Sequence, residues 1–187
     1  PKGVVIEHHS VVSLSRALRD TLYPSQEGPL RAALYAPIVF DASVEDLIQL
    51  LYGNTLYVCS ESVRLDPEEL RAFIEEHELD ILNGTPTQLN LLLACGLDLS
   101  SHTAPRFLYL GGEALGQELW SQLASIDRIR AYNLYGPTES TVDATFCPIT
   151  SERPRPVIGR PIPGTRAYIL NKHSQPTPIG VVGELCL

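Results

Sequence analysis

Strand-like and helix-like segments alternate along most of this sequence, and the alternation limits the folds that the chain can adopt. Short apolar runs with the length of buried strands lie at 32–40, 54–59, 79–82, 107–110 and 129–134. Segments with a helical pattern lie between them, at 67–77, 86–95 and 117–125. Repeated strand–helix units predict an α/β fold, in which helices cover both faces of a mostly parallel sheet.

Helix start signals support this pattern. Asp66 is followed by a proline and two glutamates, which combines an N-cap residue with a proline in the first turn. Thr85 is likewise followed by a proline. We predict Ser43 as the N-cap of another helix, with Asp46 as its capping partner three residues later. Ser10 is predicted as the N-cap of a helix near the start of the chain.

The character of the sequence changes after residue 142. Prolines and glycines crowd 148–164, and the apolar runs at 167–170 and 181–187 resemble strands without intervening helices. We therefore expect an α/β portion over 1–147 and the start of a β-rich subdomain over 148–187.

Composition narrows the possible functions. The formal net charge of -8 argues against nucleic-acid binding, which needs a basic surface. No basic cluster suits an anionic membrane, and no apolar run reaches the roughly 20 residues that span a bilayer. The cysteines form no C-x-x-C pair and lie in apolar segments, at Cys59, Cys95, Cys147 and Cys186. We expect buried, reduced thiols and a cytoplasmic location.

The segment 133–139 (NLYGPTE) has the richest chemistry. It follows a predicted strand, at the end where open α/β sheets bind their ligands. Within seven residues it places a side-chain amide, an aromatic ring, a hydroxyl and a carboxylate. Its Gly-Pro pair would also suit a simple turn after a strand.

Further motifs accompany this segment, in the order 1–3 (PKG), 40–43 (FDAS), 133–139 (NLYGPTE) and 183–185 (GEL). As a set they resemble the adenylation domains of nonribosomal peptide synthetases, in the AMP-binding, adenylate-forming superfamily, although 1–3 alone would carry no weight. The resemblance covers essentially the whole chain. It implies the truncated core of the large N-terminal subdomain, without the C-terminal subdomain that bears the catalytic lysine. We therefore expect this chain alone to have marginal stability and negligible adenylating activity.

The resemblance implies a reaction in two steps. The carboxylate of an amino acid attacks the α-phosphate of ATP, giving an aminoacyl-AMP and pyrophosphate. The acyl group then passes to the phosphopantetheine thiol of a peptidyl carrier domain, and a condensation domain is a further expected partner. Mg²⁺ would neutralise the phosphates. The protein would contribute positioning and charge stabilisation.

The resemblance also assigns residues to the nucleotide. Thr138 and Glu139 are the expected catalytic residues: Thr138 would donate a hydrogen bond to the α-phosphate, and Glu139 would help to hold Mg²⁺. Tyr135 would stack on adenine. The expected nucleotide-binding set is Gly111, Gly112, Glu113, Asn133, Tyr135, Gly136 and Thr138.

Asp41 indicates the kind of acid that is activated. In the family this position pairs with the α-ammonium group of the substrate, a buried charge that needs an opposite charge. Asp41 could instead be a helix N-cap, but Ser43 is the predicted cap. The resemblance implies a substrate pocket lined by Asp41, Ala42, Glu45, Asn83, Tyr109, Gly111, Leu134, Val142 and Asp143.

Two pocket carboxylates besides Asp41 suggest a basic side chain on the substrate. Glu45 and Asp143 would need cationic or strongly hydrogen-bonding partners in a desolvated cleft. Ornithine, lysine or arginine would satisfy them. Glutamine is the alternative, because Asn83 and Tyr109 suit an amide. The basic pocket would be ruled out if Glu45 faced solvent.

Two other functions remain open. One is an acyl- or aryl-CoA ligase of the same superfamily, against which Asp41 argues because such acids carry no ammonium group. The other is a nucleotide-binding module without catalysis. The presence of Tyr135, Thr138 and Glu139 together argues against that module, since a decaying pocket would be expected to lose one of them.

Overall fold

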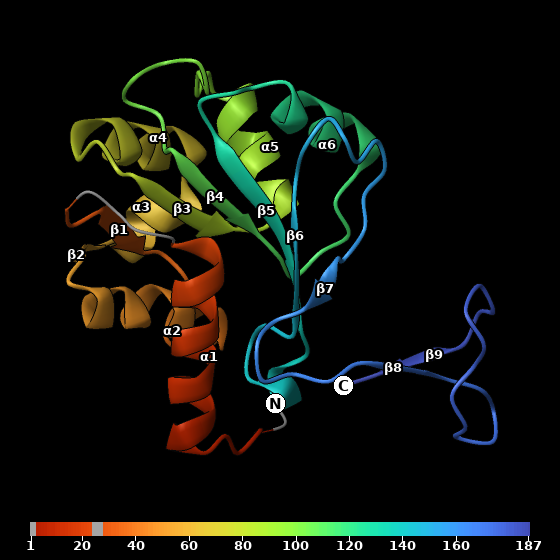
Figure 1. The fold of residues 1–187 in the computed structure, drawn as a ribbon. Helices are drawn as coiled ribbons and strands as arrows, with labels where there is room; N and C mark the ends of the chain where they lie inside the picture. Colours follow the sequence, from red (N-terminus) through yellow and green to blue (C-terminus); the bar gives the residue numbers. More distant parts are fainter. Residues whose placement is uncertain (1–2, 24–27) are drawn as a thin grey trace.

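The computed structural model describes residues 3–23 and 28–187. Its main sheet has seven strands in the order β2-β1-β3-β4-β5-β6-β7 (Figure 1). They are β1 (Arg31–Leu34), β2 (Thr55–Val58), β3 (Ile81–Gly84), β4 (Phe107–Leu110), β5 (Arg130–Tyr135), β6 (Thr145–Pro148) and β7 (Arg160–Pro161). Strands β1 to β5 pair in parallel, whereas β6 and β7 pair antiparallel. The predicted mostly parallel sheet is confirmed.

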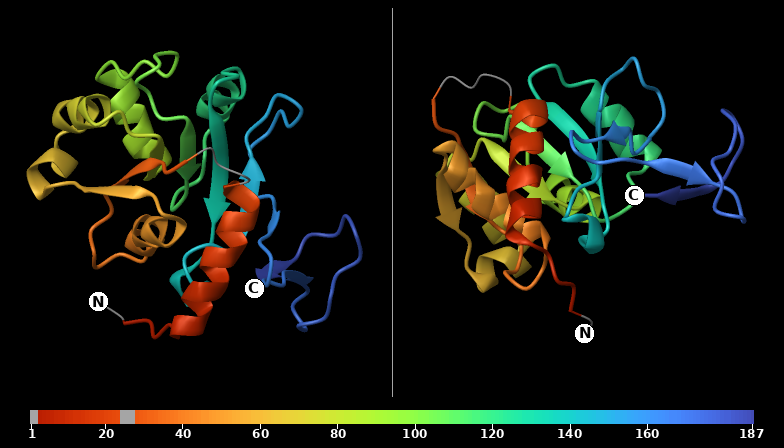
Figure 2. Two further views of the ribbon diagram at one scale, coloured as in Figure 1. Left: turned by 60° about the vertical axis from the view of Figure 1, so that its left-hand side comes forward. Right: turned by 60° about the horizontal axis from the view of Figure 1, so that its bottom comes forward.

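Helices cover both faces of this sheet. They are α1 (His8–Leu22), α2 (Ala42–Leu47), α3 (Glu61–Leu65), α4 (Pro67–Glu76), α5 (Pro86–Ala94) and α6 (Gln117–Ala124), with the 3-10 helices η1 (Ile48–Tyr52) and η2 (Thr138–Ser140). Residues of α4, α5 and α6 form a core on one face, and residues of α1 and η1 form a core on the other. Figure 2 shows α1 lying across the sheet on the face opposite α5 and α6.

Strand β4 shows why both faces are covered. Leu108 and Leu110 belong to the core under α4, α5 and α6, whereas Phe107 and Tyr109 belong to the core under α1. All four are at most 4% exposed. Successive side chains of a strand point to opposite faces, so an uninterrupted apolar run is buried only when both faces are packed.

The last part of the chain forms a separate small sheet. Strands β8 (Tyr168–Leu170) and β9 (Glu184–Cys186) pair antiparallel and extend away from the main sheet (Figure 1). The strands expected at 167–170 and 181–187 are therefore present, with the second one shorter. The division of the chain between residues 147 and 148 stays a prediction.

Several predicted boundaries were wrong at 32–46. The strand expected over 32–40 ends at Leu34, and 35–40 forms turns instead. Ser43 is not the N-cap of α2: it lies inside the helix, and its hydroxyl donates to the carbonyl of Phe40 at 2.7 Å. Asp41 occupies the N-cap position, but its side chain makes no capping hydrogen bond. Asp46, the predicted capping partner, accepts instead from the backbone N–H groups of Tyr35 and Ala36.

Three other expectations need correction. The run at 54–59 is not a fully buried strand, because β2 is the edge strand and Val58 is 73% exposed. Helix α1 begins at His8, with Glu7 rather than Ser10 at the N-cap position. All four cysteines are free, but only Cys147 is buried. None of the helices within the described residues is long and apolar enough to cross a membrane.

The predicted start of α4 offers a test of the fold. Asp66 accepts hydrogen bonds from the N–H groups of Glu68 at 2.8 Å and Glu69 at 3.3 Å. We expect Asp66→Ala to lower the free energy of unfolding, measured in urea, by ~1 kcal/mol because these groups lose their acceptor. Asp66→Asn retains a capping oxygen and should stay close to the parent. An equal loss in both variants would contradict this role.

Candidate functional site

A cavity of about 480 Å³ lies where the parallel strands end at their carboxyl edge. The segments that follow β1, β3, β4 and β5 all contribute to its wall. Open α/β sheets bind ligands at this edge, because the connections leave the strand ends there.

The cavity brings together most of the residues that the sequence had singled out. From the predicted sets it is lined by Asp41, Ala42, Glu45, Asn83, Gly111, Gly112, Leu134, Tyr135, Gly136, Val142 and Asp143. They come from α2, β3, β5 and the segments after β4 and β5. Residues far apart in the sequence therefore form one site.

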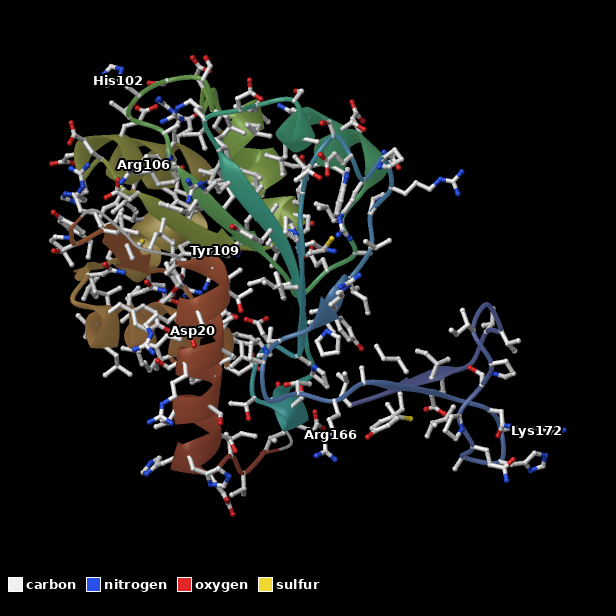
Figure 3. The ribbon with its side chains drawn as sticks, viewed as in Figure 1. Asp20, His102, Arg106, Tyr109, Arg166 and Lys172 are labelled. Carbon is white, nitrogen blue, oxygen red and sulfur yellow. The ribbon has the colours of Figure 1, made fainter. Side chains whose placement is uncertain are left out.

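The remaining predicted residues lie elsewhere. Tyr109 is buried under α1 and packs edge-on against Tyr23, with ring centroids 5.3 Å apart (Figure 3). The side chain of Asn133 donates to the carbonyl of Val157 at 2.9 Å. Glu113 is exposed and accepts from the hydroxyl of Thr87 at 2.5 Å. The predicted residues outside the cavity wall as it stands are therefore Tyr109, Asn133, Glu113 and the two expected catalytic residues, Thr138 and Glu139.

Sequence reasoning missed part of the wall. The additional lining residues are Tyr35, Ala36, Pro37, Phe40, Arg64, Gly84, Thr85 and Gln88. Arg64 belongs to α3, a five-residue helix that is too short to show a periodic pattern. Burial raises the pKa of the neighbouring Tyr35 phenol and Cys59 thiol, and the positive charge of Arg64 offsets part of that rise.

A hydrogen bond joins the two expected halves of the site. The Thr138 hydroxyl donates to Oδ2 of Asp41 at 2.5 Å, although the residues are 97 positions apart. Thr138 begins η2, directly after the Gly136-Pro137 turn, and Asp41 precedes α2. The carboxylate expected to hold an ammonium group thus contacts the hydroxyl expected to meet a phosphate.

Three further carboxyl groups are buried beside this contact. Glu45, Asp46 and Asp143 are 7%, 3% and 4% exposed. Burial raises the pKa of each, most clearly for Glu45, which also lies beside the Asp143 carboxyl. The Asn83 amide donates to Glu45 at 2.7 Å and to Asp46 at 3.3 Å. The floor of the site is therefore acidic and poorly solvated.

An unusual backbone segment presents two of the lining residues. Thr141 and Val142 have φ values of 65° and 66°, which β-branched residues rarely adopt. The N–H of Asp143 donates to the carbonyl of Thr141 at 2.9 Å, which closes a γ-turn around Val142. A Cβ on Gly136 would lie 2.3 Å from the carbonyl oxygen of Val142, so only glycine permits this close approach.

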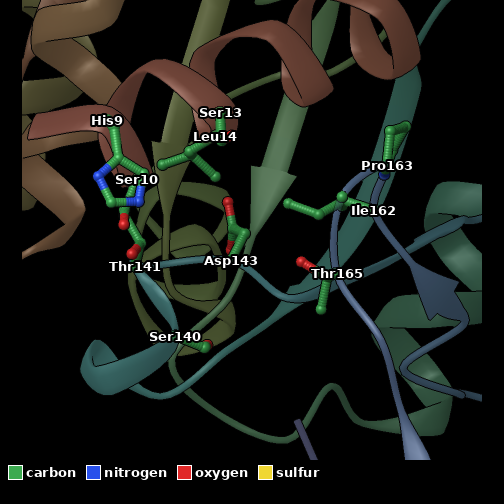
Figure 4. Close-up of a pocket in the computed structure, with 11 residues that line it drawn as sticks. His9, Ser10, Ser13, Leu14, Ser140, Thr141, Asp143, Ile162, Pro163 and Thr165 are labelled. Atoms are coloured by element: carbon green, nitrogen blue, oxygen red, sulfur yellow. The ribbon is translucent and has the colours of Figure 1, made fainter. Parts of the chain in front are cut away.

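A second cavity of about 260 Å³ lies behind Asp143 (Figure 4). It is lined by His9, Ser10, Ser13, Leu14, Ser140, Thr141, Asp143, Ile162, Pro163, Gly164 and Thr165. Figure 4 shows the Asp143 side chain between Leu14 of α1 and Ile162. Asp143 therefore borders both cavities.

The residues are compatible with a magnesium ion that is held mainly by substrate. Glu139 is exposed beside Thr138, and one or two carboxylates plus phosphates and water suffice for Mg²⁺. Within 3–23 and 28–187, no cluster of three or more His, Cys, Asp or Glu could hold a metal without such help. Pro1 and Lys2, from the motif at 1–3, lie outside the described residues.

Comparison with known proteins gives matches along the whole chain. The family described as AMP-binding enzyme matches residues 1–187. AMB antimetabolite synthetase AmbE of Pseudomonas aeruginosa is 38% identical over 186 residues, covering 99% of this chain and 9% of AmbE. Surfactin synthase subunit 1 of Bacillus subtilis is 36% identical over 195 residues, covering 99% of this chain and 5% of that protein. The chain thus spans less than a tenth of either relative.

A solved structure agrees with these matches. The crystal structure of a four-domain nonribosomal peptide synthetase bound to AMP and glycine superposes with a TM-score of 0.87 at 30% sequence identity. The match covers 99% of this chain and 14% of that one.

The buried carboxyl groups predict an unusual pH dependence of stability. Burial raises the pKa of Asp46 to about 7, against an ordinary value of about 4. Between these values the folded protein binds more protons than the unfolded chain, so the free energy of unfolding should fall as the pH rises. Asp46→Asn should reduce this slope in urea unfolding at pH 5, 6, 7 and 8.

Asp20→Asn is a matched control, because the Asp20 side chain is 63% exposed. It should leave the slope unchanged. An identical slope in the parent and Asp46→Asn would show that Asp46 does not titrate in this range.

Proposed function

The chain belongs to the AMP-binding enzyme family, among the adenylation domains of nonribosomal peptide synthetases, and on this basis we propose that it forms the amino-acid and ATP pocket of such a domain. The proposed reaction joins the carboxylate of an α-amino acid to the α-phosphate of ATP and releases pyrophosphate. The observation that carries the proposal is the cavity in which Asp41, Gly111 and Tyr135 meet at the carboxyl edge of the sheet.

Asp41 is the proposed partner of the substrate ammonium group. It lines the cavity, and in the ligand-free protein its hydrogen bond with Thr138 orients its carboxylate there. A desolvated ammonium group needs an opposite charge, which the Asp41 carboxylate would supply. An aryl or fatty acid has no such group, so Asp41 favours an amino acid.

Tyr135 is the proposed platform for adenine. Tyr135 is 41% exposed and lines the cavity beside Gly111 and Gly112, which have no side chains to obstruct a flat base. We propose that Asn133 and Glu113 bound the base from outside the present wall. Thr138 has one hydroxyl proton, so it would redirect its hydrogen bond from Asp41 to the α-phosphate when ATP binds. Glu139 would supply one ligand to Mg²⁺, which neutralises phosphate charge when bound.

The chain's own contribution to the reaction is positioning. Asp41 and Thr138 lie side by side, so the ammonium and phosphate groups of the two substrates would be held close together. Such placement converts a bimolecular reaction into an effectively unimolecular one. In a complete synthetase, the product would be passed to the phosphopantetheine thiol of a carrier domain, next to a condensation domain.

We propose a basic substrate side chain: ornithine, lysine or arginine. Glu45 faces the cavity rather than bulk solvent, as this hypothesis requires. Within the described residues, neither Glu45 nor Asp143 forms an ion pair with lysine or arginine. Buried carboxylates without a protein cation suit a cationic ligand.

Amino-acid-dependent ATP–pyrophosphate exchange on the complete domain tests this proposal. We expect exchange to be highest with ornithine, lysine or arginine among the common amino acids. Asp41→Ala should reduce it by a factor of about 30 or more, because unpairing a buried charge costs at least ~2 kcal/mol. Highest exchange with glutamine would replace the basic substrate but keep the reaction, and no exchange with any amino acid would contradict the reaction itself.

The nucleotide site has a separate test in AMP binding to the complete domain, measured by calorimetry. We expect Tyr135→Ala to weaken binding by ~1–3 kcal/mol, the usual contribution of a base stacked on an aromatic ring. Tyr135→Phe keeps the ring and should bind AMP nearly as well as the parent. Equal affinity in Tyr135→Ala and the parent would remove Tyr135 from the adenine site.

A further inference from the structure

The Glu45 and Asp143 carboxyl groups form a pair that the proposed function leaves unexplained. They come from α2 and from the γ-turn after η2, both line the larger cavity, and they lie close enough for the Asp143 charge to raise further the pKa that burial already raises at Glu45. Each is more than nine-tenths buried. Two carboxylates cannot hydrogen-bond to one another, since neither has a hydrogen to donate.

One oxygen of this pair lacks a hydrogen-bond donor. Oδ2 of Asp143 is buried and has no donor among the described residues. The Asn83 amide satisfies Oε2 of Glu45 at 2.7 Å, but it reaches only that carboxyl and Asp46. A buried acceptor without a donor costs roughly 1–3 kcal/mol, and a buried unpaired charge costs more. A proton on Glu45 would supply the missing donor and remove one charge.

The ionisable groups around Glu45 and Asp143 also favour a proton on Glu45. Asp41 adds negative charge at the start of α2. Asp46, whose pKa burial raises to about 7, adds a further negative charge only at a pH where it has lost its own proton. Tyr109 from β4 and Tyr23 after α1 are the neighbouring phenols, and burial keeps both protonated. On the far side of Asp143, the cationic candidate is His9, which is already paired with Glu7 at 2.9 Å.

We propose that Glu45 and Asp143 share one proton in the empty pocket, and that this proton determines which side chains the pocket accepts. The inference rests on the proposed function, in which this cavity receives the substrate side chain. A cationic side chain displaces the proton and pairs with two carboxylates. A neutral amide leaves the proton in place and meets one donor and one carboxylate.

Cationic and neutral side chains differ in whether a proton is released when they bind. Binding of a cation releases one proton, so its affinity rises with pH until the pair has lost its proton. While the pair stays protonated, each unit of falling pH should raise the Kd of a cationic amino acid about tenfold. The Kd of glutamine should not follow this dependence, because its binding neither takes up nor releases the shared proton.

Carboxyl NMR of the ligand-free complete domain tests the shared proton without any substrate. With ¹³C at the glutamate side-chain carboxyls, we expect one glutamate to remain protonated at pH 7 and its signal to be absent in Glu45→Gln. Asp143→Asn should lower the pH at which this signal titrates, because the neighbouring negative charge is gone. Glu118→Gln, a change of the same type on the exposed face of α6, should leave it in place.

A fully ionised Glu45 at pH 7 would overturn the proposal. An unchanged titration in Asp143→Asn would also overturn it, because Glu45 would then hold its proton alone. Both outcomes are independent of which amino acid the domain activates. The proposed function is tested separately, by pyrophosphate exchange.

Calorimetry in buffers of different ionisation enthalpy tests whether the shared proton selects the substrate side chain. We expect release of about one proton when ornithine, lysine or arginine binds at pH 7, and none when glutamine binds. Glu45→Gln should abolish the release, and Glu118→Gln should retain it. Binding of a basic amino acid without proton release, in a domain whose Glu45 is protonated, would overturn the selective role of the proton.

Discussion

The cavity exists because the strand order of the parallel sheet changes direction between the neighbouring strands β1 and β3. The chain runs from β1 to β2 on one side and from β3 to β4 on the other, so β1 and β3 are neighbours whose onward connections diverge. The first connection passes through α2 and η1 on the face of α1, and the second passes through α5 on the opposite face. Diverging connections leave a crevice at the strand ends. Tyr35 to Pro37 and Asn83 to Thr85 line that crevice.

The crevice gathers acidic side chains that would be costly in an ordinary core. Asp46 is partly compensated, because two backbone N–H groups of the segment after β1 donate to one of its oxygens. Asn83 supports Glu45 from β3. These contacts leave the charges undercompensated, as the raised pKa values show. Perturbed carboxyl groups in a cleft are typical of functional sites, where stability is lost for the sake of binding.

Sequence reasoning succeeded where the controlling interactions are local. The run at 107–110 and the Asp66 cap were identified correctly because burial on both faces and a proline after the cap leave direct signatures. It failed at Ser43, where a cap and a hydrogen bond to Phe40 are equally consistent with the sequence. Arg64 was missed because only the folded chain brings α3 to the cavity. The family motifs, rather than periodicity, located most of the lining residues.

The Gly136 contact bears on how such a pocket can change its substrate. Gly136 packs directly against the backbone of 142–144, and the γ-turn fixes where the side chains of Val142 and Asp143 project. The backbone conformation of this segment therefore depends on Gly136 and the γ-turn rather than on the chemistry of the side chains at positions 142 and 143. Other side chains can therefore replace Val142 and Asp143 without a change in this backbone, provided that they tolerate the γ-turn. Gly136 itself cannot be replaced in this way, because any Cβ at this position would clash with the backbone of Val142.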